Sequence, residues 1–129
     1  MTTSQDDHWI TRQYSPRVYQ WLEDFLRHAE TAARFVQRED REHETAQLAA
    51  RMIFIDCGET VYRIDRANPE FLMDFPELEL RDVYAMRNIS AHGYNIVNYD
   101  VIWDALENDI PRIAAKIRAF LNSGIRPDC

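Results

Sequence analysis

Cysteine, glycine and long apolar runs are scarce in this chain of 129 residues. The two cysteines, Cys57 and Cys129, form no Cys-x2-Cys or Cys/His spacing, so the sequence predicts no zinc site. No apolar run approaches the roughly 18 residues that span a bilayer, and the first residues lack the basic start and apolar middle of a signal peptide. We therefore expect a reduced, cytoplasmic protein without membrane contact, and 46% hydrophobic residues suffice for one domain with a buried core.

Positive charge is also in the minority. The 15 lysines and arginines are outnumbered by 22 aspartates and glutamates, which gives a net charge of -7. A chain of this charge repels polyanions as a whole. Any nucleic-acid site must therefore be a local one.

Apolar residues recur at helical spacing along most of the chain, which predicts an all-α fold. One stripe runs from Val18 to Val36, after Ser15 and Pro16 as a start signal, and a second runs from Ala46 to Ile64. We expect residues 15–122 to form an antiparallel bundle of four or five helices, with polar tails at residues 1–14 and 123–129.

The second half of the chain predicts two more helical regions after a long connection. The connection is "DRANPEFLMDFPELE", whose prolines break helix periodicity. We expect its apolar residues to be buried beneath it. A helix from Leu80 to about Ile89 carries apolar residues around much of its circumference, so we expect it to be buried against more than one neighbour and to end at Gly93. Pro111 interrupts a final stripe and predicts a kink or two helices, with Asp109 as a cap.

The stretch "RNISAHGY" holds the residues best suited to chemistry. Arg87 is a permanent cation with planar donors for phosphate oxygens, and His92 can take or give a proton near neutral pH. Asn88, four residues before His92, can orient the imidazole. Such groups can act on RNA: a base deprotonates the ribose 2'-hydroxyl, the oxygen attacks the adjacent phosphorus, and an acid protonates the leaving 5'-oxygen without any metal.

Helix geometry alone does not make Arg87 and His92 converge, because about 100° per residue places them roughly 140° apart. One chain also supplies only one such histidine, whereas the reaction needs both an acid and a base. A twofold homodimer that pairs two copies of the segment would meet both needs. The alternative is a salt-bridging arginine and a histidine that interacts with the helix dipole. We expect the other histidines, at positions 8, 28 and 43, to be solvated or locally paired, and no His/Asp/Glu cluster has metal-ligand spacing. We expect Tyr84 and Trp103 to be core or interface aromatics rather than base-stacking platforms.

Two segments together resemble a known family. "YAMRNISAHGY" and "YDVIWDALENDIPRIAAKIRAFL" resemble the HepT-like ribonuclease toxins of the HEPN superfamily, with the motif Arg-x4-His-x-Tyr at Arg87, His92 and Tyr94. The resemblance covers residues 18–121. It implies an all-helical homodimer and a metal-independent endoribonuclease without cofactors, the toxin of a type VII toxin-antitoxin pair. Arg87 and His92 are then catalytic and Asn88 supporting.

The resemblance also implies a partner and a mode of silencing. The partner is a MntA-like minimal nucleotidyltransferase antitoxin that transfers AMP from ATP to the motif tyrosine, here Tyr94. An added phosphodiester would repel RNA and fill the cleft.

Some residues depart from the family pattern. The second helix has "CGET" where an Ile-Gly-Glu-Ala-like segment is usual, and Leu80 or a neighbour stands where a tryptophan is common. The acidic chain also needs a cleft that gathers arginines such as Arg51, Arg81 and Arg87. Two other hypotheses stay open: a non-cleaving HEPN subunit that binds a nucleotidyltransferase or nucleotide, and a purely structural helical dimer.

Overall fold

The computed structural model describes the backbone of residues 14–91 and 99–123 and the side chains of residues 14–86 and 99–123. Every element in this part is helical: α2 (Pro16–Arg38), α3 (Glu44–Ala67), α4 (Pro69–Asp74), the 3-10 turn η1 (Pro76–Leu78), α5 (Leu80–Ala91), α6 (Tyr99–Asp104), the π-helical turn η2 (Ala105–Asp109) and α7 (Ile110–Asn122). Because α6, η2 and α7 follow one another without a break, the described elements group into five helices and one 3-10 turn. The predicted all-helical class is confirmed.

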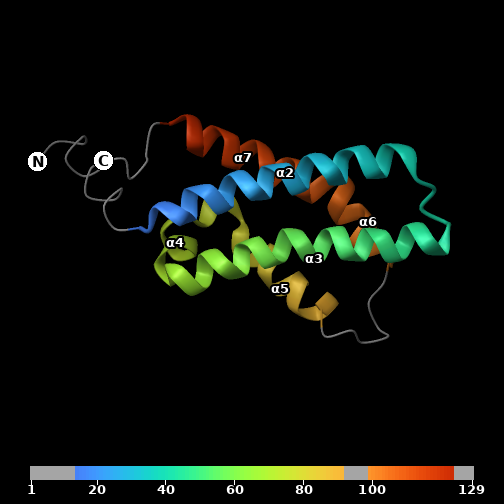
Figure 1. Ribbon diagram of the computed structural model, residues 1–129, viewed down its shortest axis with the longest axis horizontal. Coiled ribbons are helices and arrows are strands. Elements are labelled where there is room, and N and C mark those ends of the chain that lie inside the picture. The colour runs from blue at the N-terminus through green and yellow to red at the C-terminus, as the bar shows by residue number, and fades with distance from the viewer. Residues whose placement is uncertain (1–13, 92–98, 124–129) are drawn as a thin grey trace, which may run out of the picture.

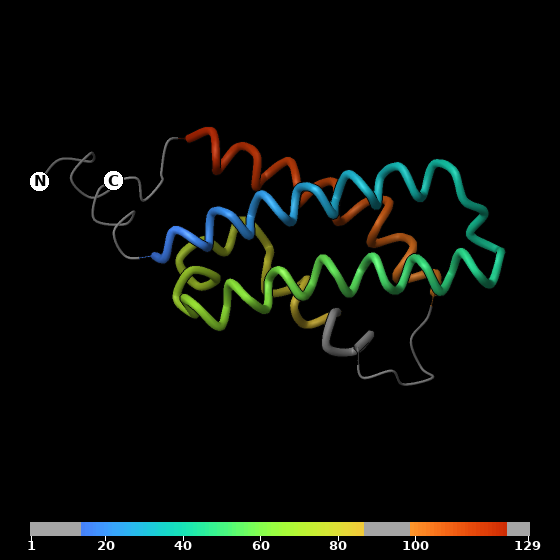
Figure 2. The backbone as a smooth tube through the Cα atoms, viewed as in Figure 1, coloured from blue at the N-terminus to red at the C-terminus, as the bar shows by residue number. Residues whose placement is uncertain are grey.

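Helices α2 and α3 form a long antiparallel hairpin through the middle of the molecule (Figure 1). The start of α2 is the predicted one: the Ser15 side chain accepts a hydrogen bond from the backbone N–H of Arg17 at 3.2 Å, and Pro16 is the first helical residue. Helix α7 packs against α2, and α5 packs against α3. Helix α6 packs beside α3, and the trace in Figure 2 shows the chain crossing from there to α2, where α7 continues.

The core lies between the hairpin and the α6–α7 run. Its largest fully buried side chains come from every helical segment except α5: Val18, Leu22 and Phe25 from α2, Phe54 and Ile64 from α3, Phe71 and Leu78 from the α4 region, and Ile102, Leu106, Ile110, Ile113 and Ile117 from the last segment. Those from α2 and from the last segment belong to the periodic apolar stripes of the sequence, whereas Phe71 and Leu78 come from the connection. Burial of these core side chains is the main stabilising contribution to the fold.

The predicted connection after α3 is partly wrong, because it contains a short helix. Asn68 precedes α4, and Pro69 occupies the first turn, where its missing N–H costs no hydrogen bond. Phe71, Leu72 and Leu78 are buried as expected, whereas Met73 of the same connection is 67% exposed. Asn68 Oδ1 also accepts a hydrogen bond from the Ser15 N–H at 2.7 Å, which ties the start of α4 to the start of α2.

Pro111 interrupts the last segment without breaking it. The five residues before α7 form a π-helical turn, in which the N–H of Ile110 reaches the carbonyl of Ala105. This wider turn makes room for the proline ring at the first turn of α7. The expected role of Asp109 as a cap is wrong: its backbone is helical and it makes no side-chain cap hydrogen bond, because its carboxylate pairs with Arg112 at 2.9 Å instead.

Within residues 14–91 and 99–123, no helix is both long and apolar enough to cross a membrane.

Candidate functional site

Helix α5, which carries the start of the Arg-x4-His motif, lies at the edge of the bundle (Figure 1). It packs principally against α3, through the buried side chains of Leu80 and Val83. The expectation that this helix is buried against several neighbours is therefore wrong within the described chain: Tyr84 and Met86 are only half-buried, and Ala85 is exposed.

The register of α5 against α3 follows from two pairs of residues. Arg81 lines a pocket of about 530 Å³ together with Asp65, and one turn later Tyr84 stacks on Tyr62 with ring centroids 5.9 Å apart. Residue numbers thus rise along α5 as they fall along α3. One further turn brings the backbone at position 87 level with the part of α3 that holds Gly58 and Glu59, the two family-like residues of "CGET".

The structure places the motif residues only in part. Arg87 and Asn88 lie in the last turns of α5, and their side chains are outside the described residues. His92 and Tyr94 lie outside the described residues altogether, as does Gly93, the expected helix terminator. The described elements on either side of this segment are α5 and α6, and each is held by specific contacts.

The beginning of α5 is fixed by Glu79. This residue has a left-handed backbone with φ of 60°, which costs a non-glycine residue about 1–3 kcal/mol. Its carboxylate accepts hydrogen bonds from Arg112 Nη2 and Nε, at 2.8 and 3.1 Å, and from Lys116 Nζ at 2.5 Å. The hydrogen bonds from Arg112, and then from Lys116, lower the pKa of Glu79 to about 2. Both cations belong to α7, so α5 starts from a point anchored across the bundle.

This anchor predicts a pH-dependent stability. Because the pKa of Glu79 falls from 4.5 to about 2 on folding, its contribution is fully present above pH 4.5 and is lost as the pH falls through 2. We expect Glu79→Gln to be less stable than the wild type at pH 7, with a difference that shrinks as the pH falls below 4.5. Urea unfolding at a series of pH values measures this. Glu77→Gln, an exposed change in the same turn, is the control, and a difference that does not vary with pH would contradict the prediction.

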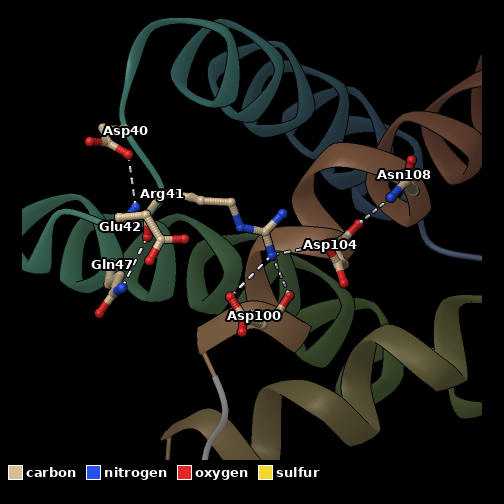
Figure 3. Close-up of polar contacts among 7 residues, drawn as sticks. All are labelled: Asp40, Arg41, Glu42, Gln47, Asp100, Asp104 and Asn108. Carbon is tan, nitrogen blue, oxygen red and sulfur yellow. Dashed lines mark hydrogen bonds and ion pairs between the residues drawn. The ribbon is translucent and has the colours of Figure 1, made fainter.

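The end of the motif segment is fixed by Arg41, in the connection between α2 and α3 (Figure 3). Its Nη2 donates to the carboxylates of Asp100 and Asp104 on α6, at 3.2 and 3.1 Å. The guanidinium also lies over the Trp103 ring, 6.0 Å from its centroid. The backbone around Arg41 is held in turn, because Gln47 Nε2 donates to its carbonyl at 2.9 Å.

Trp103 anchors α6 from the inside. Its side chain is 3% exposed and packs on Phe35 of α2 with centroids 5.3 Å apart, which confirms that it is a core aromatic. Together, Arg41 on the outer side and Phe35 on the inner side fix where the chain re-enters the bundle after the motif.

Cys57 and two arginines belong to the packed helices α3 and α5. Burial, with a smaller contribution from the Asp56 carboxylate, raises the pKa of the Cys57 thiol to about 12, so it stays protonated and serves packing. Arg81 is exposed but shares its pocket with Asp65 and Asp82, which offset its charge, so this pocket does not supply the expected basic surface. Arg51 is half-buried on α3. Across the residues that the structure describes, no three His, Cys, Asp or Glu side chains could together hold a metal ion.

Helix α5 thus carries Arg87 and Asn88 in its last turns, and Arg41 and Phe35 hold α6, which follows the motif. The family model described as "Ribonuclease HepT-like" matches residues 20–120. The chain belongs to the HepT-like ribonuclease family. This match covers α2 from its second turn to the last turn of α7, so the HepT-like region includes every helix described above.

Other comparisons are sparser. A protein of Methanocaldococcus jannaschii named "Putative RNase MJ1380" is 25% identical to this HepT-like chain over 101 residues, which are 78% of this chain and 93% of that protein. No solved structure matches the chain significantly. The recognition of the family from "YAMRNISAHGY" is thus confirmed.

Proposed function

We propose that this HepT-like chain is a cytoplasmic endoribonuclease that cuts RNA by attack of the ribose 2'-hydroxyl on the adjacent phosphorus. The observation that carries the proposal is the family match over residues 20–120, with Arg-x4-His-x-Tyr beginning on an exposed-edge helix. The protein named as an RNase in Methanocaldococcus jannaschii supports the same activity.

The chemistry assigns one role to each motif residue. His92 of one copy takes the 2'-hydroxyl proton, the O2' atom bonds to phosphorus, and the bond from phosphorus to the 5'-oxygen breaks. His92 of the second copy returns a proton to that oxygen. Arg87 stabilises the negative charge that develops on the phosphoryl oxygens, and Asn88 orients the imidazole. The products are a 2',3'-cyclic phosphate and a 5'-hydroxyl, and no metal takes part.

A homodimer is required by this scheme, and the edge position of α5 supports it. Among the described helices α5 packs chiefly on α3, Ala85 is exposed, and Tyr84 and Met86, which pack against the core, stay half-buried. Pairing of two α5 surfaces would cover these side chains and bring the two copies of Arg87 and His92 together.

We further propose that the chain is the toxin of a type VII toxin-antitoxin pair, silenced by a MntA-like nucleotidyltransferase that transfers AMP to Tyr94. Tyr94 is two residues from His92, so each adenylyl group would place negative charge and bulk at the reacting phosphate.

The test combines cleavage and mass. Protein expressed and purified without a nucleotidyltransferase partner should cut single-stranded RNA in the presence of EDTA and leave cyclic phosphate ends. Protein expressed with a nucleotidyltransferase partner should gain mass in whole AMP units and lose cleavage. Tyr94→Phe should not gain that mass, whereas Tyr99→Phe, a half-buried tyrosine of α6, should gain it as the wild type does. Unmodified protein that leaves all RNA intact would favour the non-cleaving binding subunit instead.

A further inference from the structure

A shallow groove between α2 and α3 combines cations with aromatic rings. Its lining consists of Trp21, Tyr62, Arg63, Arg66 and Ala67, and it holds about 450 Å³. Small-molecule sites measure about 300–1,000 Å³, so the groove has room for one or two nucleotide units. Among the residues described, its lining includes no carboxylate, although the whole chain has a net charge of -7.

The arginines near this groove contact aromatic rings, whereas several other arginines of the molecule pair with carboxylates. Arg27, Arg41 and Arg112 pair with carboxylates. By contrast, Arg17 lies over the Trp21 ring at 5.1 Å, and Arg66 lies over the Tyr62 ring at 5.7 Å while donating to its hydroxyl at 3.0 Å.

Their positive charge is therefore not cancelled locally. In the described part of the chain, no carboxylate forms an ion pair with Arg17, Arg63 or Arg66, and all three are exposed. A guanidinium that stacks on a ring keeps donors at its edge for a phosphate oxygen. Exposed cation–π pairs of this kind contribute only about 0.5–1 kcal/mol to stability, so the fold does not depend on them.

The groove also connects to the motif helix. Tyr62, which lines the groove, stacks on Tyr84 of α5 at 5.9 Å. The backbone of position 87 lies about one turn after Tyr84 along α5. A strand that lies in the groove and crosses this tyrosine pair is directed towards the motif.

We propose that this groove is the binding track for single-stranded RNA leading to the motif, with Arg17, Arg63 and Arg66 on phosphates and Trp21 stacking on a base, while Tyr62 supports Arg66 from below. Alternating cations and aromatic faces are the usual means by which proteins hold single strands without reading sequence. The inference rests on the proposed function, because it assigns the substrate path of the same site. An acidic partner protein would use the charges but would not need the half-buried ring of Trp21.

The test measures binding separately from cleavage. A fluorescently labelled single-stranded RNA is titrated with His92→Ala protein, so that the RNA is not cut, and its anisotropy is followed at several salt concentrations. Adding Arg63→Gln and Arg66→Gln should weaken binding about tenfold or more. Because each phosphate contact contributes about 0.7 to the slope of log K against log salt concentration, the loss of two contacts should reduce the magnitude of that slope by roughly 1.4. Adding Trp21→Leu alone should weaken binding about fivefold or more with little change in the salt slope.

The matched control is the pair Arg34→Gln and Arg118→Gln, which removes two exposed arginines of α2 and α7 with the same charge change. Equal loss in both pairs would reduce the effect to net charge and overturn the track. Unchanged RNA binding with lost binding of a nucleotidyltransferase would overturn it in favour of a protein surface. Wild-type protein that binds RNA through the groove without cutting it would leave the track in place and remove the proposed nuclease function.

Discussion

Replacing His92 with alanine should lower RNA cleavage by about 10²–10⁴-fold while leaving the fold and RNA binding unchanged. In a twofold dimer the substitution removes both the base that takes the 2'-hydroxyl proton and the acid that protonates the leaving oxygen, so we expect the upper end of this range. Cleavage of a labelled RNA in EDTA measures the rate, and circular dichroism with RNA anisotropy measures fold and binding.

The control is His43→Ala. His43 is exposed, sits just before α3 and makes no side-chain cap hydrogen bond, so its loss should leave cleavage within about twofold of the wild type. Cleavage by His92→Ala at the wild-type rate would remove His92 from the mechanism. A loss of folding in His92→Ala would support a structural histidine instead.

The same cleavage assay measures the contribution of Arg87 separately from that of His92. Its alanine variant should lose about 10²–10³-fold in rate, because a donor to the developing phosphoryl charge is removed. Arg87→Lys should recover only part of this loss, since an ammonium keeps the charge but lacks the planar pair of donors. Full recovery with lysine would mean that only charge at this position matters.

The helices themselves could be predicted from the sequence, because their apolar periodicity is strong and their ends carry signals such as Ser15-Pro16. The short helix α4 was missed because Pro69 and Pro76 suggest a break at both ends of a six-residue stretch, which is too short for periodicity to be recognised. The π-helical turn before Pro111 was predicted only as an interruption, since its form depends on how the buried face continues from Leu106 to Ile110.

Residues that act through tertiary contacts were harder to predict. Arg41 and Glu79 lie in charged runs, and the sequence does not show that their partners are Asp100 and Asp104 in one case and Arg112 in the other. The groove could have been found from the hairpin alone. Trp21 and Tyr62 lie about equally far from Arg41 along the chain, and an antiparallel hairpin brings such positions together.

The motif gives the reverse case, in which sequence is the stronger guide. Arg-x4-His-x-Tyr identifies residues by type and spacing alone, whereas the described structure shows how the elements on either side are held. The two kinds of information meet at α5: the sequence assigns chemistry to its last turns, and packing on α3 determines which surface it leaves uncovered.

The largest effect on stability is expected from Phe71→Ala in α4, the element that the sequence did not predict. Phe71 is 0% exposed and contacts three rings, with centroid distances of 5.1 Å to Tyr14, 5.0 Å to Phe75 and 5.7 Å to Phe120. Removing a fully buried phenylalanine costs about 3–5 kcal/mol, because transfer free energy is lost and a cavity remains. That is a large part of the roughly 5–15 kcal/mol that stabilises a domain.

The matched control is Met73→Ala, two residues later on the same helix. Met73 is 67% exposed, so its truncation should change the free energy of unfolding by less than about 0.5 kcal/mol. Urea unfolding should show a lower midpoint for Phe71→Ala with an unchanged slope. A cost below about 1 kcal/mol, or equal effects of the two variants, would mean that α4 is not docked on the core.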